Sequence, residues 1–292
     1  MADIKLTSTS RANLLTLNQT TDLANRTQSR LATGLKVGSA IDDATAYFAA
    51  KSLSDRASDF TARKDEIDQG ISSLKTALGA TESADKILKQ LKGVAISAKT
   101  ADDATKADLG AQFADLVDQL NSLLGDASYQ GTNLINSTTQ SLTVRFSEVT
   151  TAELTVASRD LRAGAILSTA LNASDAGSVV AAALIGGSSF TAIATSELVT
   201  TINDITDAID GAISSVRATA SNLGSNVTLL QTRSDFTTDY VNALTEGSDK
   251  LTLADLNEEG ANLVALQTRQ QLALRALSFA GQSEQSVLSL FS

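Results

Sequence analysis

Residues 202–230 read INDITDAIDGAISSVRATASNLGSNVTLL and carry the clearest pattern in the chain. Apolar side chains recur every three or four residues, at Ile202, Ile205, Ile209, Ala212, Val216, Ala220, Leu223, Val227 and Leu230. This spacing puts one apolar side chain per turn on a single helical face, so it predicts a long amphipathic helix. The pattern continues weakly through Thr237, Val241 and Leu244.

Similar stripes lie on both sides of this stretch. They comprise Leu14, Leu17, Thr21, Ala24, Gln28, Leu31 and Leu35 near the N-terminus; Ile67, Ile71, Leu74, Leu78, Ala84, Leu88, Leu91, Ala95 and Ala98; Leu109, Phe113, Leu116, Leu120 and Leu123; and finally Leu263, Leu266, Ala273, Leu277, Ala280, Val287 and Phe291. The chain contains no proline, the residue that most strongly interrupts a helix. We therefore predict a mainly α fold of long helical rods whose terminal segments pair with each other. Periodicity alone leaves open whether the packing is coiled-coil-like or that of an ordinary helical bundle.

A different texture separates the helical stretches. Residues 142–146 alternate in polarity, and residues 153–157 are rich in β-branched side chains, so we predict a β-hairpin with its turn over 147–151. Residues 162–196 are rich in Ala, Ser and Gly. We interpret 140–196 as a small, loosely specified insertion between two helical halves.

The composition excludes most enzyme chemistry. The chain has no Cys and no His, which removes thiolate nucleophiles, zinc-binding cysteine sets, Ser-His-Asp triads and the HExxH site. No glycine-rich phosphate loop is present, and neither Asp42-Asp43 nor Asp102-Asp103 lies in a calcium-loop pattern, so helix caps or solvated charges are favoured there. We predict a protein that is not an enzyme, with no catalytic residue, metal site or cofactor.

The charge distribution points to partners other than nucleic acid or membrane. The net charge is −10, whereas nucleic-acid binders show a basic surface. No run of 18 apolar residues could span a bilayer, and residues 1–10 lack the apolar stretch of a cleaved secretory signal. Residues 1–64 hold nine basic and six acidic side chains and residues 250–292 hold three and four, but residues 65–249 hold eleven and twenty-three. A solvated acidic surface is the simpler and favoured interpretation of this pattern, and the alternative is that the ends pack together in an assembly while the middle faces water.

Two blocks carry a family resemblance that periodicity does not supply. Residues 30–44 read RLATGLKVGSAIDDA, and residues 129–135 read YQGTNLI. The first resembles the N-terminal signature of bacterial flagellins, R-L-[SA]-[ST]-G-[LK]-[RK]-[IV]-x-S-A-x-D-[DN]-A, and the second resembles the family block [FY]-[NQ]-G-x-x-L-[IL]. Residues 257–272 and 285–291 are similar to the flagellin C-terminus, in the manner of alphaproteobacterial members.

The resemblance implies a structural subunit that self-assembles into the bacterial flagellar filament used for swimming. It implies export without a cleaved signal, an extracellular location in the flagellum, and a homopolymer as the main partner. A flagellar export chaperone and the hook-associated and cap proteins are the further partners that it implies. The insertion at 140–196 resembles no segment of the family.

The same resemblance implies a division into three parts. Residues 1–42 and 250–292 would form the filament-core antiparallel coiled coil, 43–139 and 197–249 the helical rod domain, and 140–196 a surface-exposed insertion. The assembly-core residues that we predict are Leu14, Leu17, Leu31, Leu35, Leu263, Leu266, Leu277, Val287 and Phe291. The signature residues predicted to form the spoke between core and rod are Arg30, Gly34, Gly38, Asp42 and Asp43.

A further expectation concerns a motif that this chain lacks. Flagellins detected by the mammalian Toll-like receptor carry a motif like Q-R-x-R-E-L-A on the long rod helix, and alignment places residues 89–95 there. Gln90 then replaces the arginine, Gly93 the glutamate and Val94 the leucine of that contact. We expect this degenerate motif to bind the receptor weakly.

Two other functions remain open from the sequence. A hook–filament junction protein shares flagellin-like termini, and a non-flagellar secreted coiled-coil filament subunit shares the helical pattern. The second would leave the signature blocks unexplained.

Overall fold

The computed structural model describes residues 8–147, 151–171 and 198–289, and within them the fold is mainly α. The helices are α1 (Ser8–Thr33), α2 (Ala44–Ala98), α3 (Asp103–Asp126), α4 (Ala163–Leu171), α6 (Leu198–Thr252) and α7 (Leu256–Ser289). The strands are β1 (Ser128–Tyr129), β2 (Thr132–Asn133), β3 (Ser141–Arg145) and β4 (Glu153–Ala157). The predicted fold class, with long helices and a small hairpin-containing insertion, is confirmed.

The chain divides into two compact units. Unit 1 comprises Met1–Ser58 and Val241–Ser292, and unit 2 comprises Asp59–Tyr240. The long helices α2 and α6 contribute residues to both units. The domain boundaries expected from the family resemblance remain a prediction.

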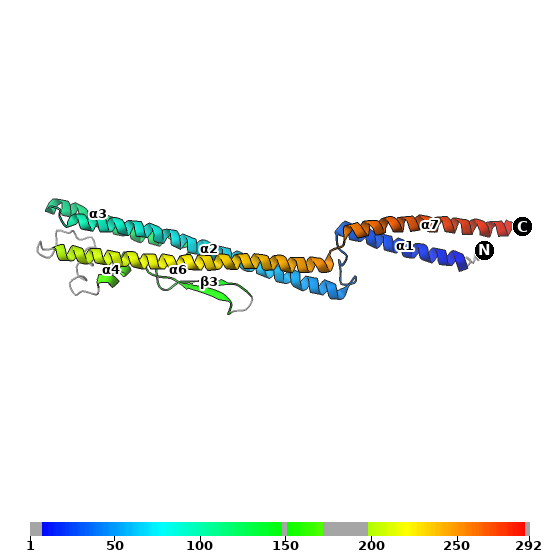
Figure 1. The fold of residues 1–292 in the computed structure, drawn as a ribbon, viewed down its shortest axis with the longest axis horizontal. Coiled ribbons are helices and arrows are strands. Elements are labelled where there is room, and N and C mark those ends of the chain that lie inside the picture. The colour runs from blue at the N-terminus through cyan, green and yellow to red at the C-terminus, as the bar shows by residue number, and fades with distance from the viewer. Residues whose placement is uncertain (1–7, 148–150, 172–197, 290–292) are drawn as a thin grey trace. The chain divides into compact units, whose positions relative to one another are not determined.

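In unit 2, α2 and α6 pair antiparallel, and α3 folds back along them (Figure 1). The predicted stripe of α6 forms one wall of the core, where Ile202, Ile209 and Leu230 are at most 1% exposed. The buried positions differ from the predicted stripe at one residue: Thr219 is buried, whereas the predicted Ala220 is only half-buried. From α3, Phe113, Val117, Leu120 and Leu124 enter the same core.

Local capping explains where α3 begins and ends. The Asp102 carboxylate accepts a hydrogen bond from the Thr105 backbone N–H and so satisfies a free donor of the first turn. At the other end, Asn133 donates from Nδ2 to the carbonyls of Leu124 and Gly125. The turn between β1 and β2 places Gln130 and Gly131 at φ of 49° and 81°, the left-handed region that favours Gly at the second position.

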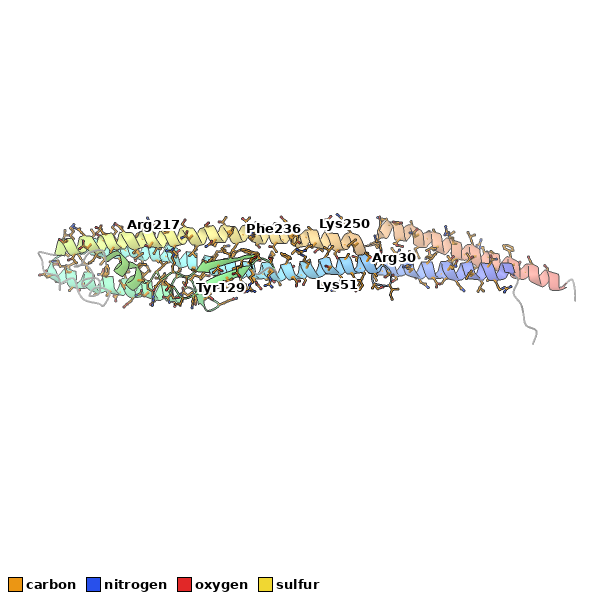
Figure 2. All side chains as sticks on the ribbon, turned by 90° about the horizontal axis from the view of Figure 1, so that it is seen from below. Arg30, Lys51, Tyr129, Arg217, Phe236 and Lys250 are labelled. Atoms are coloured by element: carbon orange, nitrogen blue, oxygen red, sulfur yellow. The ribbon has the colours of Figure 1, made fainter. Side chains whose placement is uncertain are left out.

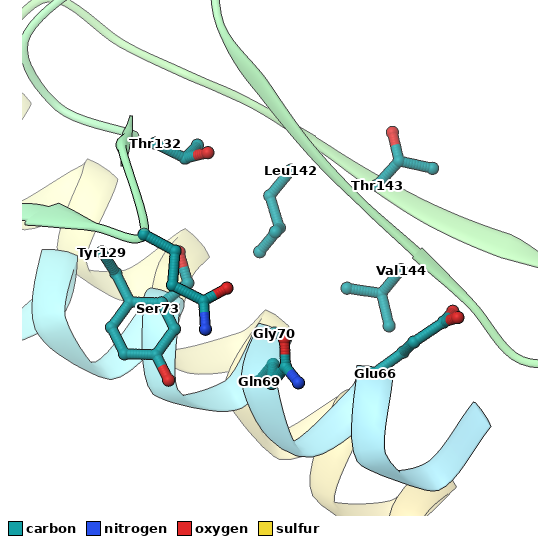
Figure 3. A pocket seen from close by; sticks show the side chains of 10 residues that line it. Glu66, Gln69, Gly70, Ser73, Tyr129, Thr132, Leu142, Thr143 and Val144 are labelled. Atoms are coloured by element: carbon teal, nitrogen blue, oxygen red, sulfur yellow. The ribbon is translucent and has the colours of Figure 1, made fainter. Parts of the chain in front are cut away.

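The predicted hairpin is present as the antiparallel pair β3–β4, in which Leu142 faces Val156 and Val144 faces Leu154. Its predicted turn partly lies outside the described residues. Val144 meets α2 at Gly70, where an added Cβ would stand only 2.6 Å from Val144 Cγ2 (Figure 3). The hairpin therefore packs on α2 because glycine leaves room there. Helix α4 was not predicted, and the rest of the Ala/Ser/Gly-rich stretch, 172–197, lies outside the described residues.

Candidate functional site

The candidate site lies in unit 1, where α1 and α7 run antiparallel side by side (Figure 1). The less exposed positions of each helix alternate steps of three and four residues, the spacing of a coiled-coil seam. Those with this spacing are Asn13, Leu17, Thr20, Ala24, Thr27 and Leu31 on α1 and Glu259, Leu263, Leu266, Gln270, Ala273, Leu277 and Ala280 on α7, and Thr21, Arg30 and Gly260 beside them are also partly buried. Many of these side chains are small or polar, so the seam buries little apolar surface.

The described part of the predicted α7 stripe, from Leu263 to Ala280, coincides with this seam, but the predicted stripe of α1 is partly displaced. Leu17, Ala24 and Leu31 lie on the seam as expected. Thr20 and Thr27 are buried there, whereas Leu14 is 42% exposed and Gln28 is exposed. Leucines occur on more than one face of α1, so the packing of α7 determines which of these faces is covered.

The outward faces of the pair carry large apolar side chains. They are Leu14, Leu15 and Leu23 on α1 and Leu256, Val264, Leu272, Leu274 and Phe279 on α7. Phe279 is 70% exposed and Val264 64%. Exposed apolar surface of this extent marks a site of protein–protein contact.

The residues predicted for the assembly core fall into three groups. Leu17, Leu31, Leu35, Leu263, Leu266 and Leu277 are half-buried, whereas Leu14 is exposed. Val287 belongs to α7, but its side chain lies outside the described part of the structure, as does the whole of Phe291. Whether these side chains act in assembly remains a prediction.

The signature residues form a compact connection after α1. Gly34 has φ of +73° and donates its N–H to the Arg30 carbonyl, so it ends α1 in the left-handed conformation that glycine adopts readily. Lys36 and Val37 both donate backbone N–H groups to the Thr252 carbonyl. The connection that leaves α1 is thereby joined to the C-terminal end of α6.

The two signature aspartates organise the next turn. The Asp42 Oδ2 atom accepts hydrogen bonds from the backbone N–H groups of Gly38 and Ser39 and from the Ser39 hydroxyl, at 3.0–3.2 Å. The hydroxyl bond is the main reason that the pKa of Asp42 lies below its ordinary value, with Arg26, 3.6 Å away, as a smaller contributor. Asp43 accepts from the Ala46 N–H and begins α2.

Arg30 joins the two helices of unit 1 through an ion pair. Its Nη1 atom lies 2.8 Å from Oε1 of Glu259, whose side chain is only 10% exposed. Arg30 lies in the last turn of α1 and Glu259 in the first turn of α7, so each charge is also favoured by its own helix dipole. The sequence analysis singled out Arg30 but missed Glu259. A signal existed, since Glu259 lies four residues before Leu263 on the predicted stripe.

The stretch aligned with the receptor motif lies on α2 in unit 2. Gln90 and Gly93 are exposed, and Val94 packs against the core. The two lysines of the stretch form ion pairs, Lys89 with Asp85 and Lys92 with Asp210. An added Cβ at Gly93 would meet nothing within 4 Å.

A hollow of about 230 Å³ between α2 and the strands is lined by Glu66, Gln69, Gly70, Ser73, Tyr129 and Leu142 among others (Figure 3). Across 8–147, 151–171 and 198–289, no group of three acidic side chains is placed to hold a metal ion. Within the same ranges no helix is long and apolar enough to cross a membrane.

Comparison with known proteins agrees with the signature blocks. The N-terminal helical region of bacterial flagellin matches residues 4–140, and the C-terminal helical region matches 206–291. A flagellin of Brucella melitensis is 30% identical over all of this chain and 99% of its own length. Flagellin FljO of Caulobacter vibrioides is 31% identical, covering 95% of this chain and 94% of its own. The crystal structure of Bacillus cereus flagellin shares 16% identity at a TM-score of 0.45, over 59% of this chain and 88% of its own. The chain belongs to the bacterial flagellin family, the structural subunits of the flagellar filament.

Proposed function

We propose that this chain polymerises through unit 1, with the outward faces of α1 and α7 as its contacts with neighbouring subunits. One observation carries the proposal. Of the fourteen large apolar side chains that are exposed in the described part of the chain, eleven belong to unit 1 and three to unit 2. Unit 1 by itself therefore leaves unburied the surface that a filament would cover.

The free energy of burying apolar side chains supports contacts between subunits through unit 1. Burying a Leu or Phe side chain contributes about 1.5–3 kcal/mol. The seam of α1 and α7, with its Thr, Ala and Gln residues, gains little of this within one subunit, so additional burial must come from neighbours. Stability of the terminal pair would then be collective and depend on subunit concentration.

The remaining parts of the proposal follow the family. Residues 1–42 and 250–292 form the filament core, 43–139 and 197–249 the rod, and 140–196 a surface insertion. The protein is structural and has no enzymatic activity. It leaves the cell without a cleaved signal, is located in the extracellular flagellum, binds an export chaperone through its C-terminal segment, and meets hook-associated and cap proteins at the filament ends.

Electron microscopy of the purified protein after polymerisation tests the proposal. We expect the protein alone to form long filaments, whereas a hook–filament junction protein would not propagate by itself. Phe279→Ser and Leu272→Ser should each raise the critical concentration about 10- to 100-fold, because each removes about 1.5–3 kcal/mol of buried apolar surface. Ile96→Ser, an exposed apolar residue of unit 2, is the matched control and should polymerise nearly normally. Equal effects of the three substitutions would contradict the proposal.

A further inference from the structure

In unit 2, three contacts between polar side chains of α2 and α6 lie beside the apolar seam of these two helices, and we call this row of contacts the polar ladder. Lys92 Nζ lies 2.6 Å from Asp210 Oδ1, and Arg217 Nε lies 2.9 Å from Asp85 Oδ1. Farther along, Lys99 Nζ donates to Asn203 Oδ1 at 3.1 Å. Arg217 projects from α6 in Figure 2. The three rungs come from α2 positions 85, 92 and 99 and α6 positions 217, 210 and 203, so they are one heptad apart on both helices.

The apolar seam does not by itself specify this alignment. The α6 stripe repeats every seven residues, through Ile202, Ile209, Val216, Leu223 and Leu230. A seam with this period presents apolar side chains again after a shift of seven residues. An additional interaction is therefore needed to make one axial register more stable than the registers shifted by seven residues.

The ladder distinguishes the pairings by charge. A one-heptad slip in one direction would bring Asp85 opposite Asp210, and a slip in the other would bring Lys92 opposite Arg217. The first slip replaces two attractive pairs by a like-charge pair, which is destabilising between neighbouring helices. The second slip also creates a like-charge pair, and it brings Lys99 opposite Asp210, so it keeps one attractive pair where the observed alignment has two. Hydrogen bonds from Lys89 and Arg217 hold the pKa of Asp85 below its ordinary value, so its carboxylate is charged at neutral pH.

We infer that Asp85, Lys92, Asp210 and Arg217 are positioning residues that fix the axial register of α2 against α6. The register matters because α2 and α6 together form the surface on which the β3–β4 hairpin packs, which we call the seat of the hairpin. An added Cβ at Gly70 of α2 would stand 2.6 Å from Val144 and 3.5 Å from Leu230 of α6, so these three residues meet at one point. On α6, Arg233 also lies over the Phe146 ring, 5.1 Å from its centroid. A slip of seven residues would separate the two halves of this seat by about 10 Å.

The absence of cysteine makes the register measurable in the whole chain. Ile96 of α2 and Leu229 of α6 are exposed, at 51% and 44%, and Ile96→Cys/Leu229→Cys accepts two spin labels. In the observed alignment the labelled positions are separated by about 35 Å along the rod. Pulsed electron resonance reports this distance in the monomer, and the result does not depend on whether the chain forms filaments.

Asp210→Lys is the decisive variant. It makes the Lys92 rung repulsive and makes Asp85 attractive to position 210 in the slipped pairing. We expect a new distance about 10 Å longer, populated at least about tenfold above its level in the parent, which corresponds to about 1.4 kcal/mol. The swap Lys92→Asp/Asp210→Lys should restore the original distance.

Asp207→Lys makes the same charge change at an exposed α6 carboxylate that forms no ion pair with α2 in the described residues, and it should leave the distance unchanged. An unchanged distance in Asp210→Lys would overturn the inference. If Asp210→Lys instead loses helicity by circular dichroism, recovery of helicity and distance in the swap supports the ladder, and failure of the swap to recover them overturns it.

Discussion

The two units of this flagellin bury their apolar residues in opposite ways. In unit 2, side chains such as Ile67, Leu74, Leu88 and Phe113 are at most 1% exposed in a continuous core. In unit 1 the seam holds threonines and glutamine, while Phe279 stands 70% exposed. Helices with similar apolar stripes can thus bury those side chains within their own unit, as in unit 2, or leave large apolar side chains exposed, as in unit 1.

Specific polar contacts compensate for the weak apolar seam of unit 1. The Arg30–Glu259 ion pair and the hydrogen bond from Gln270 Nε2 to Thr21 Oγ1, 2.8 Å long, are directional. They specify how α1 and α7 are aligned without adding much burial. Under the proposed function, a pair aligned in this way would gain its remaining stability from neighbouring subunits.

The largest expected effect comes from separating the two regions. A fragment of residues 45–250 should lose polymerisation completely, because it lacks α1 and α7, and should remain a helical monomer, because it keeps the core of unit 2. Sedimentation and circular dichroism test both halves of this expectation. Filaments formed by the fragment, or loss of all its helicity, would break the comparison.

The second prediction concerns the outward surface of unit 2. In the alignment expected from the sequence, Gln90 and Gly93 replace the arginine and the glutamate of the receptor motif, and an interface hot spot contributes about 2 kcal/mol or more. Because two such contacts are lost, about 4 kcal/mol together, we expect receptor binding and activation to be weaker by at least a few hundred-fold than for a receptor-binding flagellin, at about 1.4 kcal/mol per decade. A reporter-cell assay should show a large gain for Gln90→Arg/Gly93→Glu/Val94→Leu. Strong signalling by the unmodified monomer would refute this expectation.

The third prediction compares a tight and an open position on one helix of unit 2. Gly70→Val should lower the free energy of unfolding by about 1–3 kcal/mol more than Gly79→Val, because overpacking against Val144 adds to the shared change in helix propensity. An added Cβ at Gly79 meets nothing within 4 Å, which makes it the matched control. Denaturant titrations measure the difference, and equal losses would show that the hairpin does not pack closely on α2.

The smallest effect is a dependence on pH. The Asp85 carboxyl has its pKa lowered from 3.8, first by the hydrogen bond from Lys89 and then by Arg217, against a desolvation effect. A carboxyl whose pKa is lowered by folding stabilises the fold at pH values above 3.8, and this contribution to the free energy of unfolding is lost as the pH falls below that value. Asp85→Asn should therefore lose less stability than the parent between pH 6 and pH 3, by up to about 1 kcal/mol. Asp207→Asn serves as control, and identical pH profiles of Asp85→Asn and the parent would contradict the assignment.

Much of the helical architecture follows from local pattern. The stripes of α6 and α7, the hairpin of β3 and β4, and the cap at Asp102 were all readable from the sequence, because each depends on residues within a few turns of one another. The helix α4 was not, since Ala163–Leu171 is almost wholly apolar and small and shows no alternation of polarity. Periodicity cannot identify an element that lacks a polar face.

By itself, the sequence determined the family, the helical class and the residues of the signature. Only the tertiary structure decided which face of α1 is covered, that Glu259 rather than a nearby residue pairs with Arg30, and that Gly70 seats the hairpin. These partners lie far from one another in sequence, with Arg30 and Glu259 separated by 229 positions. A stripe states that a face is apolar, but only the packing of distant segments determines what covers it and in which register.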